Sequence, residues 1–418
     1  CAKCHRLGGL GGAGTNADNV DLLTIQAPRN VTSIDDELRR KVVAFHPGLA
    51  ISRQQATAFS PAAVAVQLSA TTVLHRFSSD PNYEAWRRRF LAGSRTIRLP
   101  LDRIVAFNTG KSLRPLGGMH PVQRLEGLAY QYSERNTPAL FGAGLIDGLP
   151  DAVFEEMLVR QAETTDSYIS GKIPRVAGGK AGRFGWRGQS ENLHEFVLGA
   201  CAVELGLEAP GRAQPIDPLR VSFDRPLAVD SLGLDISDEQ CKSLTQFVAH
   251  LPPPRILKPT DTAQAAAVAR GEERFEKIGC ADCHFKQVAD IAGIYSDLLL
   301  HDMGEGLADP VPANPGGSPS YYGGGDSLLV KTPPDQQREW RTPPLWGARD
   351  SGPYLHDGRA PTFPEAIAWH AGEAARSALA FRQLEKAEQE EVLAFLNCLA
   401  APATESLALE NVLLADGQ

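Results

Sequence analysis

The sequence predicts a mainly α-helical protein made of two related halves, with long loops throughout and a few short strands inserted in the first half. Three observations support this prediction. A motif of two cysteines and a histidine occurs once in each half, apolar residues recur at helical spacing near the end of each half, and turn-forming residues are abundant, with 39 glycines and 30 prolines. The 418 residues provide ample material for two domains.

Each half is predicted to end in a similar helix. In the first half, Ser237 and Gln240 match a capping box, apolar residues follow at helical spacing to Leu251, and a run of prolines ends the helix. In the second half, residues 392–399 repeat this spacing and Pro402 follows. The segments LTQFVAHLPPP and VLAFLNCLAAP are therefore interpreted as two copies of one closing helix.

A second pair of similar segments supports an internal duplication: RNTPALFGA begins at Arg135 and RTPPLWGA at Arg341. The predicted domains are residues 1–258 and 259–418, and residues 263–278 are predicted to form the helix that leads into the second cysteine motif. Most of the extra length of the first half precedes Arg135, where the runs AVAVQL and TTVLHRF are typical of short strands.

The two cysteine motifs, CAKCH and CADCH, match the attachment signature of c-type haem. In that chemistry two thiols add to the two vinyl groups of one porphyrin, and the following histidine is held beneath the iron. A zinc site would instead need both cysteine pairs to converge on one ion, and a redox dithiol would need a thioredoxin-like context. We predict two covalent haem c groups, attached at Cys1, Cys4, Cys280 and Cys283, with His5 and His284 as proximal iron ligands.

Composition and charge exclude several classes of partner. The formal net charge of −8 argues against nucleic acid or an anionic membrane surface as the main partner. No apolar run approaches the ~18 residues typical of a transmembrane helix. The other three cysteines, Cys201, Cys241 and Cys398, are predicted to be buried thiols.

Covalent haem also bears on the location of the protein. Because haem c is assembled outside the cytoplasm, we predict a periplasmic or otherwise exported protein. The chain begins abruptly at a cysteine motif without a signal peptide, so we expect an upstream segment that has been removed.

The motifs occur in the order CxxCH, RNTPALFGAGLID, FGWRGQ, a second CxxCH, YSDLLLHDMGEGL, EWRTPPLWGA and YLHDGRAPTFPEAIAWHAGEA. This order resembles the di-haem oxidoreductase (putative peroxidase) family and, more distantly, the bacterial di-haem cytochrome c peroxidases and a related tryptophylquinone-maturing enzyme. The resemblance implies two cytochrome-c-like domains in a peroxidase-like enzyme. One haem would react with peroxide or a similar small oxidant. The other would relay electrons from a small redox protein, such as a cytochrome or cupredoxin, or from a quinol-linked donor.

The resemblance distinguishes two histidines of the last motif, His356 and His370. In the related peroxidases, the second axial ligand of the C-terminal haem follows the first of these positions by fourteen residues, at the end of a short helix. The residues agree, because Thr362 can cap a helix whose first turn contains Pro364 and Glu365. We predict that His370 is an iron ligand and that the haem it binds has a low reduction potential. We place His356 beside the haem. The alternative for His370 is a surface histidine at a helix end.

The distal ligand of the N-terminal haem is left open by the sequence. His46, His75 and His120 are candidates, and an open or water-ligated iron is the alternative. Peroxide cleavage needs proton transfer and stabilisation of charge. The resemblance places such groups around the Arg-Asn-x-Pro loop, which implies Glu134, Arg135 and Asp147 as catalytic residues. A structural ion pair is the alternative for Arg135, and a helix cap is the alternative for Asp147.

Three further groups of residues are candidates for supporting roles. In the loop LLLHDMG, packing near the haem edge is favoured over iron ligation for His301 and Met303. The resemblance implies a calcium ion bound partly by Thr342 and Pro344. Four tryptophans could pass electrons or pack in the core: Trp186, Trp340, Trp346 and Trp369.

Two other functions compete with peroxidase activity, namely an electron-transfer cytochrome without a substrate and a haem enzyme that oxidises an organic or protein substrate.

Overall fold

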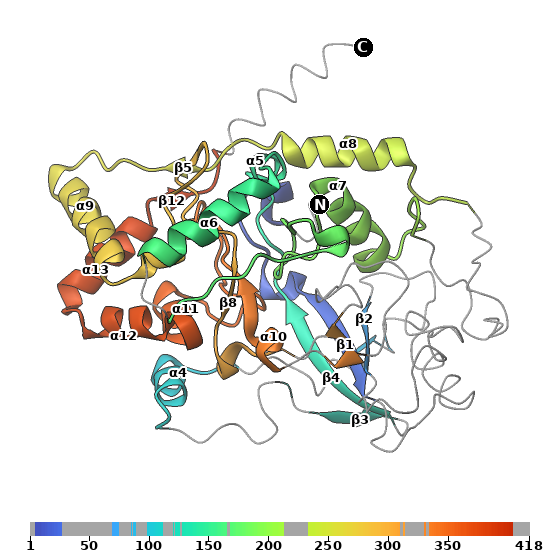
Figure 1. Cartoon of the computed structure of the whole chain (residues 1–418), viewed down its shortest axis with the longest axis horizontal. Helices are drawn as coiled ribbons and strands as arrows, with labels where there is room; N and C mark the ends of the chain where they lie inside the picture. The colour runs from blue at the N-terminus through green and yellow to red at the C-terminus, as the bar shows by residue number, and fades with distance from the viewer. Residues whose placement is uncertain are drawn as a thin grey trace, which may run out of the picture.

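Figure 1 shows the chain as a computed structural model. The described residues are 5–26, 69–74, 85, 87–88, 98–111, 120, 122–125, 128–164, 168–212, 233–309, 312–313, 330–331 and 334–403. Four positions singled out in the sequence, Cys1, Cys4, His46 and His75, lie outside these residues. No helix in the described part of the chain has the length and apolar character needed to cross a membrane.

The first half combines an antiparallel sheet with helices. The sheet order is β2-β1-β4-β3, with β1 Val20–Gln26, β2 Ser69–Leu74, β3 Gln123–Leu125 and β4 Leu128–Arg135. The helices are α4 Leu101–Asn108, α5 Ala143–Asp147, α6 Asp151–Thr164, α7 Leu193–Gly199, a π-helical turn Ala200–Glu204, and α8 Asp238–Ala249. Strand β2 contains the TTVL segment that the sequence predicts as a strand, whereas AVAVQL lies outside the described residues.

The second half is built mainly from helices joined by loops and short strand pairs. Its helices are α9 Thr262–Lys277, α10 Pro334–Arg338, α11 Phe363–Trp369, α12 Ala375–Gln383 and α13 Lys386–Leu396. Four antiparallel pairs join β5 Arg255–Ile256 to β12 Leu399–Ala400, β6 Gln287–Val288 to β7 Ile291–Ala292, β8 Leu300–Asp302 to β11 Glu339–Arg341, and β9 Pro312–Ala313 to β10 Val330–Lys331. In Figure 1, α9, α12 and α13 gather at one side of the molecule and the four-stranded sheet lies at the other.

Two of the predicted helices are confirmed and a third ends earlier than predicted. Helix α9 matches the predicted leading helix, and α8 begins with the predicted capping box at Ser237. The second closing helix, α13, ends at Leu396, so the prediction of helix through residue 399 is wrong. Leu399 pairs instead with Ile256 in a two-stranded ladder, and this pairing buries its side chain completely.

The two halves pack against each other through shared apolar side chains. One core cluster contains Leu140 and Phe141 from the first half together with Phe285, Leu299 and Trp346 from the second. Helix α4 of the first half packs on α11, where the Asn108 side chain donates a hydrogen bond of 2.7 Å to the Ala368 carbonyl. The predicted boundary at residues 258 and 259 stays a prediction, and β5 just before it already pairs with the second half.

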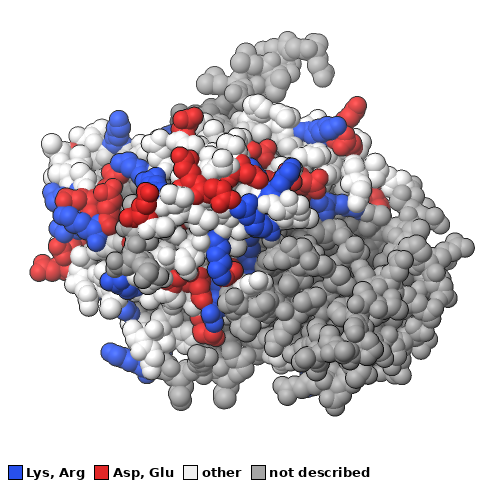
Figure 2. Space-filling model, in the orientation of Figure 1, with Lys and Arg blue, Asp and Glu red and all other residues white. Residues whose placement is uncertain are grey.

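Charged side chains of both signs cover the surface. Figure 2 shows basic and acidic groups interspersed over the described part of the visible face, without one continuous basic region there. At the crossing of α9 and α13, for example, Arg270 and Arg274 both pair with Glu391, at 2.6 and 2.7 Å. Such a mixed surface agrees with the modest net negative charge of the chain.

Helices α9 and α13 cross at very close range. A Cβ atom at Gly271 of α9 would lie 1.9 Å from the Glu391 carbonyl oxygen of α13, so only glycine fits there. Next to the crossing, Phe275 contacts Phe395 with ring centroids 5.3 Å apart. Because this helix pair frames the second cysteine motif, its close approach sets the position of that motif.

We predict that Gly271→Ala destabilises the protein, although alanine favours a helix. The overlap with the Glu391 carbonyl forces the helices apart, at a cost of about 1–3 kcal/mol. Urea unfolding measures the change. Lowering helix propensity at an exposed site of the same helix, in Ala269→Gly, serves as the control and costs about 1 kcal/mol. An increase in stability for Gly271→Ala contradicts the close crossing.

Candidate functional site

One largely apolar cavity of about 420 Å³ extends along the contact between the two halves. Its walls include side chains from both halves, among them His5, Phe141, Val197, His284 and His370. The described cysteines of the second motif, Cys280 and Cys283, also line it. Both histidine motifs of the sequence therefore open into one space.

The three histidines are held in the same way. In each ring, Nδ1 contacts a backbone carbonyl oxygen: Pro138 at 2.9 Å for His5, Tyr295 at 2.8 Å for His284 and Ala366 at 2.8 Å for His370. A nitrogen that contacts a carbonyl has to carry the proton, so Nε2 is the nitrogen left to bind a metal. This arrangement is typical of imidazole ligands, whose second nitrogen fixes the orientation of the ring.

Burial keeps these imidazoles neutral at pH 7. It lowers the pKa of His5 and of His284 to about 4 and also lowers the pKa of His370. His370 itself contributes to the lowered pKa of His284, so the two rings lie within electrostatic reach of each other. Neutral rings with a free Nε2 are competent iron ligands.

The local sequence explains how His370 reaches the cavity. Helix α11 starts at Thr362, whose side chain and that of Glu365 form a capping box, and Pro364 occupies the first turn. His370 is the C-cap, with extended backbone angles, and its ring is held against the last turn by the Nδ1 contact with the Ala366 carbonyl. The predicted helix and its cap are confirmed.

The environment of the CADCH motif disfavours a redox dithiol. Burial raises the pKa of the Cys280 thiol to about 12 and also raises that of Cys283, whereas reactive CxxC pairs have lowered values. Among the described residues, one group could hold a metal other than haem iron: Cys283, Asp297 and His301 bring their ligand atoms within 4.8 Å of one another. Thioether attachment of Cys283 would remove the thiolate that such a site needs.

The cavity also contains a positive group suited to a haem carboxylate. Arg341 lines the cavity, and its Nη1 is buried without a hydrogen-bond partner. Burial lowers the pKa of Arg341 to about 10, which leaves it charged at pH 7. An anionic group such as a porphyrin propionate would satisfy it. Apolar walls, histidines with a free Nε2 and this guanidinium together fit a haem.

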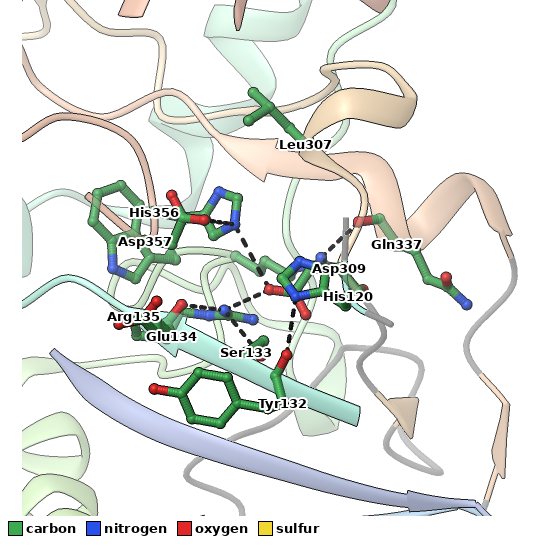
Figure 3. Close-up of polar contacts among 12 residues, drawn as sticks. His120, Tyr132, Ser133, Glu134, Arg135, Leu307, Asp309, Gln337, His356 and Asp357 are labelled. Atoms are coloured by element: carbon green, nitrogen blue, oxygen red, sulfur yellow. Dashed lines mark hydrogen bonds and ion pairs between the residues drawn. The ribbon is translucent and has the colours of Figure 1, made fainter. Parts of the chain in front are cut away.

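A buried polar cluster lies beside the cavity and is shown in Figure 3. Arg135 Nη1 donates to Asp309 Oδ2 at 2.6 Å, and the Asp309 side chain is fully buried. Burial alone would raise the pKa of Asp309, but Arg135 and neighbouring cations lower it overall. His356 Nε2 is 3.6 Å from Asp309, and the His356 ring stacks on Trp340 with centroids 3.7 Å apart. Of these residues, His356 and Trp340 line the cavity.

Residues 124–399 match the model of the family described as di-haem oxidoreductase, putative peroxidase. The chain belongs to this family. Over 119 residues it is also 32% identical to the hydrazine synthase subunit gamma of Kuenenia stuttgartiensis, a match covering 26% of this chain and 34% of that protein. The chain thus spans about a third of the length of that curated relative. A solved structure of Kuenenia stuttgartiensis hydrazine synthase pressurised with xenon matches 39% of this chain and 56% of that chain, with 21% identity and a TM-score of 0.26.

The residues implied as catalytic in this di-haem oxidoreductase lie outside the cavity lining. Arg135 forms the buried ion pair with Asp309, and Glu134 Oε1 accepts a hydrogen bond from Asn19 at 3.3 Å. Asp147 Oδ1 accepts the backbone N–H of Leu193 at 2.7 Å, at the start of α7. These contacts favour the structural alternatives, and the catalytic roles stay predictions.

The remaining candidates occupy varied surroundings. His120 lies in the buried cluster, where its Nδ1 contacts the Tyr132 carbonyl at 3.0 Å, and it is absent from the described cavity lining. The Thr342 carbonyl accepts a hydrogen bond from Ser296 Oγ at 2.8 Å, so one oxygen expected for calcium already has a protein partner. Three of the tryptophans line the cavity, namely Trp186, Trp340 and Trp346. Trp369 packs in the core with no exposed surface.

Sequence analysis missed the charged partners that surround these residues. Asp309 lies 174 positions from Arg135, and no motif marks it. Asp357 and Arg359 form a second buried pair at 2.6 Å within the HDGR motif. Buried arginines flank Trp340, with the Arg187 guanidinium 4.1 Å from its ring. The sequence offered one signal for these charged partners, namely the opposite charges of Asp357 and Arg359 two residues apart.

We predict that Asp309→Asn destabilises the protein by about 3–5 kcal/mol, because it removes the carboxylate charge that faces the buried Arg135 guanidinium. Chemical unfolding measures the loss. Glu273→Gln breaks the exposed pair with Lys277 and serves as the control, with a change of about 0.5 kcal/mol or less. Equal effects of the two substitutions contradict the structural role of the buried pair.

Proposed function

We propose that the protein is a di-haem c oxidoreductase of the peroxidase type. Cys280 and Cys283 attach one haem, with His284 and His370 as its axial ligands. The CAKCH motif attaches the other, with His5 as proximal ligand. The haem at CAKCH is the site for hydrogen peroxide or a similar small oxidant. The haem at Cys280 and Cys283 receives electrons from a small redox protein or a quinol-linked donor. Export to the periplasm follows from the assembly of haem c outside the cytoplasm.

The observation that carries this proposal is the shared arrangement of His5, His284 and His370. Each ring uses Nδ1 on a backbone carbonyl and lines the same apolar cavity. Among these described imidazoles, one belongs to the first motif and two lie near the second, which supports two histidine ligands for the iron at the second motif.

The residues of the chain have distinct tasks in this proposal. Haem iron supplies one-electron chemistry and a position where a small oxidant binds. Apolar side chains such as Phe196 and Val197 exclude water from the cavity. Arg341 holds a negative group at the wall, and the backbone carbonyls of Pro138 and Tyr295 keep the proximal rings oriented.

An electron-transfer cytochrome is the second candidate function. One observation favours it: Glu134, Arg135 and Asp147, the residues implied as catalytic, lie outside the described cavity lining. A high-spin ferric signal together with turnover of hydrogen peroxide supports the enzyme, whereas low-spin iron at both haems and no turnover supports the carrier.

We predict two covalently bound haems per chain. Intact-mass measurement of the purified protein should show two added haem masses, and Cys280→Ala should weaken attachment of the second haem alone, because one of its two thioether bonds is lost. Cys398→Ala, at a buried cysteine of neither motif, is the control and should retain both. A single haem mass, or zinc bound in place of the second haem, contradicts the proposal.

We predict that His370, and not His356, ligates the second iron. His370→Ala should create a new high-spin ferric signal, and His370→Met should keep six ligands but raise the reduction potential, because a thioether favours ferrous iron. His356→Ala is the matched control, since His356 also lines the cavity, and it should do neither. A new high-spin signal from His356→Ala alone would show that the ligand assignment is wrong.

A further inference from the structure

We propose that Glu373, acting through His301, positions His370 as a ligand of the second haem, and that the first half of the chain supplies part of this support. The residues involved are here called the Glu373 network, and they are Glu373, His301, Asp297, Gln161 and Ser170. The inference rests on the proposed ligation by His370, and it adds a role for residues that the family resemblance leaves at the haem edge.

Glu373 anchors the segment that follows His370. It lies three residues after His370, in the short 3-10 helix Gly372–Ala374. Its carboxylate accepts the backbone N–H of Ser170 at 3.1 Å, the Ser170 hydroxyl at 3.2 Å and the backbone N–H of Asp302 at 3.3 Å. His301 Nδ1 lies 2.7 Å from the same carboxylate. Four contacts therefore fix one side chain just beyond the ligand.

His301 links Glu373 to the interior. Its Nε2 lies 2.8 Å from Asp297 Oδ2, so each ring nitrogen faces a carboxylate and neither is left for iron. The His301 side chain is only 2% exposed. The His301 ring therefore bridges the Glu373 and Asp297 carboxylates through its two nitrogens.

The network continues to the proximal side of the same haem site. Gln161 of α6 donates to Asp297 Oδ2 at 3.0 Å and lies 3.2 Å from the Asp282 carbonyl, which is inside the CADCH motif. Its Oε1 accepts the backbone N–H of Gly171 at 2.8 Å. A continuous set of hydrogen bonds therefore runs from the segment after His370 to the loop that carries His284.

Two glycines permit the close approach that the network needs. A Cβ atom at Gly171 would lie 2.5 Å from Gln161 Oε1 and 2.9 Å from His301 Cε1. A Cβ atom at Gly372 would lie 2.1 Å from the Asp302 carbonyl oxygen, and Gly372 has a positive φ of 54°. The backbone on both sides of Glu373 is therefore shaped to bring these side chains together.

The position of His370 depends on an anchor of this kind. His370 ends α11 with extended backbone angles, so the helix fixes its main chain only from the N-terminal side. On the C-terminal side, Ala371 and Gly372 lead directly to Glu373. His370 Nδ1 keeps its own partner, the Ala366 carbonyl, so Glu373 acts on His370 only through the backbone between them. Loss of Glu373 should release that backbone and let His370 leave the iron.

The test is the number of carbon monoxide molecules that the reduced, haem-loaded protein binds per chain. An iron with two histidine ligands takes up carbon monoxide only when one ligand leaves. His370→Ala is the positive control and should gain one carbon monoxide per chain relative to the unsubstituted protein. Glu373→Ala should show the same gain. Glu390→Ala, at an exposed glutamate of α13, should show none.

Two further variants keep the test decisive. Glu373→Gln has nearly the size of the native residue, but its single amide oxygen can accept only one of the N–H groups of Ser170 and Asp302, which bond to different carboxylate oxygens, and it loses the charge that faces His301. Gln161→Leu removes one of the two links from the first half and leaves the other, at Ser170, in place. Both should gain carbon monoxide binding, and Glu373→Gln replaces Glu373→Ala if that variant does not fold.

The outcomes separate this inference from the proposed ligation. No gain in His370→Ala means that His370 is not the ligand, and the proposed function loses that assignment. A gain in His370→Ala with unchanged stoichiometry in Glu373→Ala and Glu373→Gln overturns the role of Glu373. An unchanged Gln161→Leu beside responsive Glu373 variants overturns the contribution of Gln161.

Discussion

The structure depends on buried imidazole rings whose Nδ1 atoms are fixed by backbone carbonyls. A polar ring in an apolar cavity is costly unless its N–H is satisfied, and His5, His284 and His370 each satisfy it locally. The same bond selects the tautomer that leaves Nε2 for a metal. The folding requirement and the ligand requirement are therefore met by one contact in each ring. The rest of the fold brings these three contacts around one space.

The two halves cooperate because they share both the cavity and the polar groups beside it. Leu140 and Phe141 pack with Trp346 in one core, so neither half closes its side of the cavity alone. The Arg135–Asp309 pair crosses the same contact in a fully buried setting. Buried charges of this kind cost desolvation and are retained when their partners are correctly placed. Motion of one half relative to the other would break them, which supports a fixed geometry between the two haem motifs.

The sequence predicts the local features better than the long-range ones. The capping box at Ser237, the helix cap at Thr362 and the helix before CADCH follow from short patterns, and the structure confirms them. The end of α13 was mispredicted because a strand partner at Ile256, far along the chain, determines where Leu399 goes. The partners of Arg135 and His301 were likewise invisible, since spacing carries no information about contacts 174 or 72 residues away. The residues assigned as catalytic from the resemblance, Glu134, Arg135 and Asp147, make contacts within the fold that the sequence did not reveal.

A crystal structure of the haem-loaded protein would test the central claim most directly. The account predicts Nε2 of His5 on one iron, Nε2 of His284 and His370 on opposite faces of the other, and thioether bonds at Cys280 and Cys283. A metal ion held by Cys283, Asp297 and His301, or a second iron without His370 as a ligand, would contradict it.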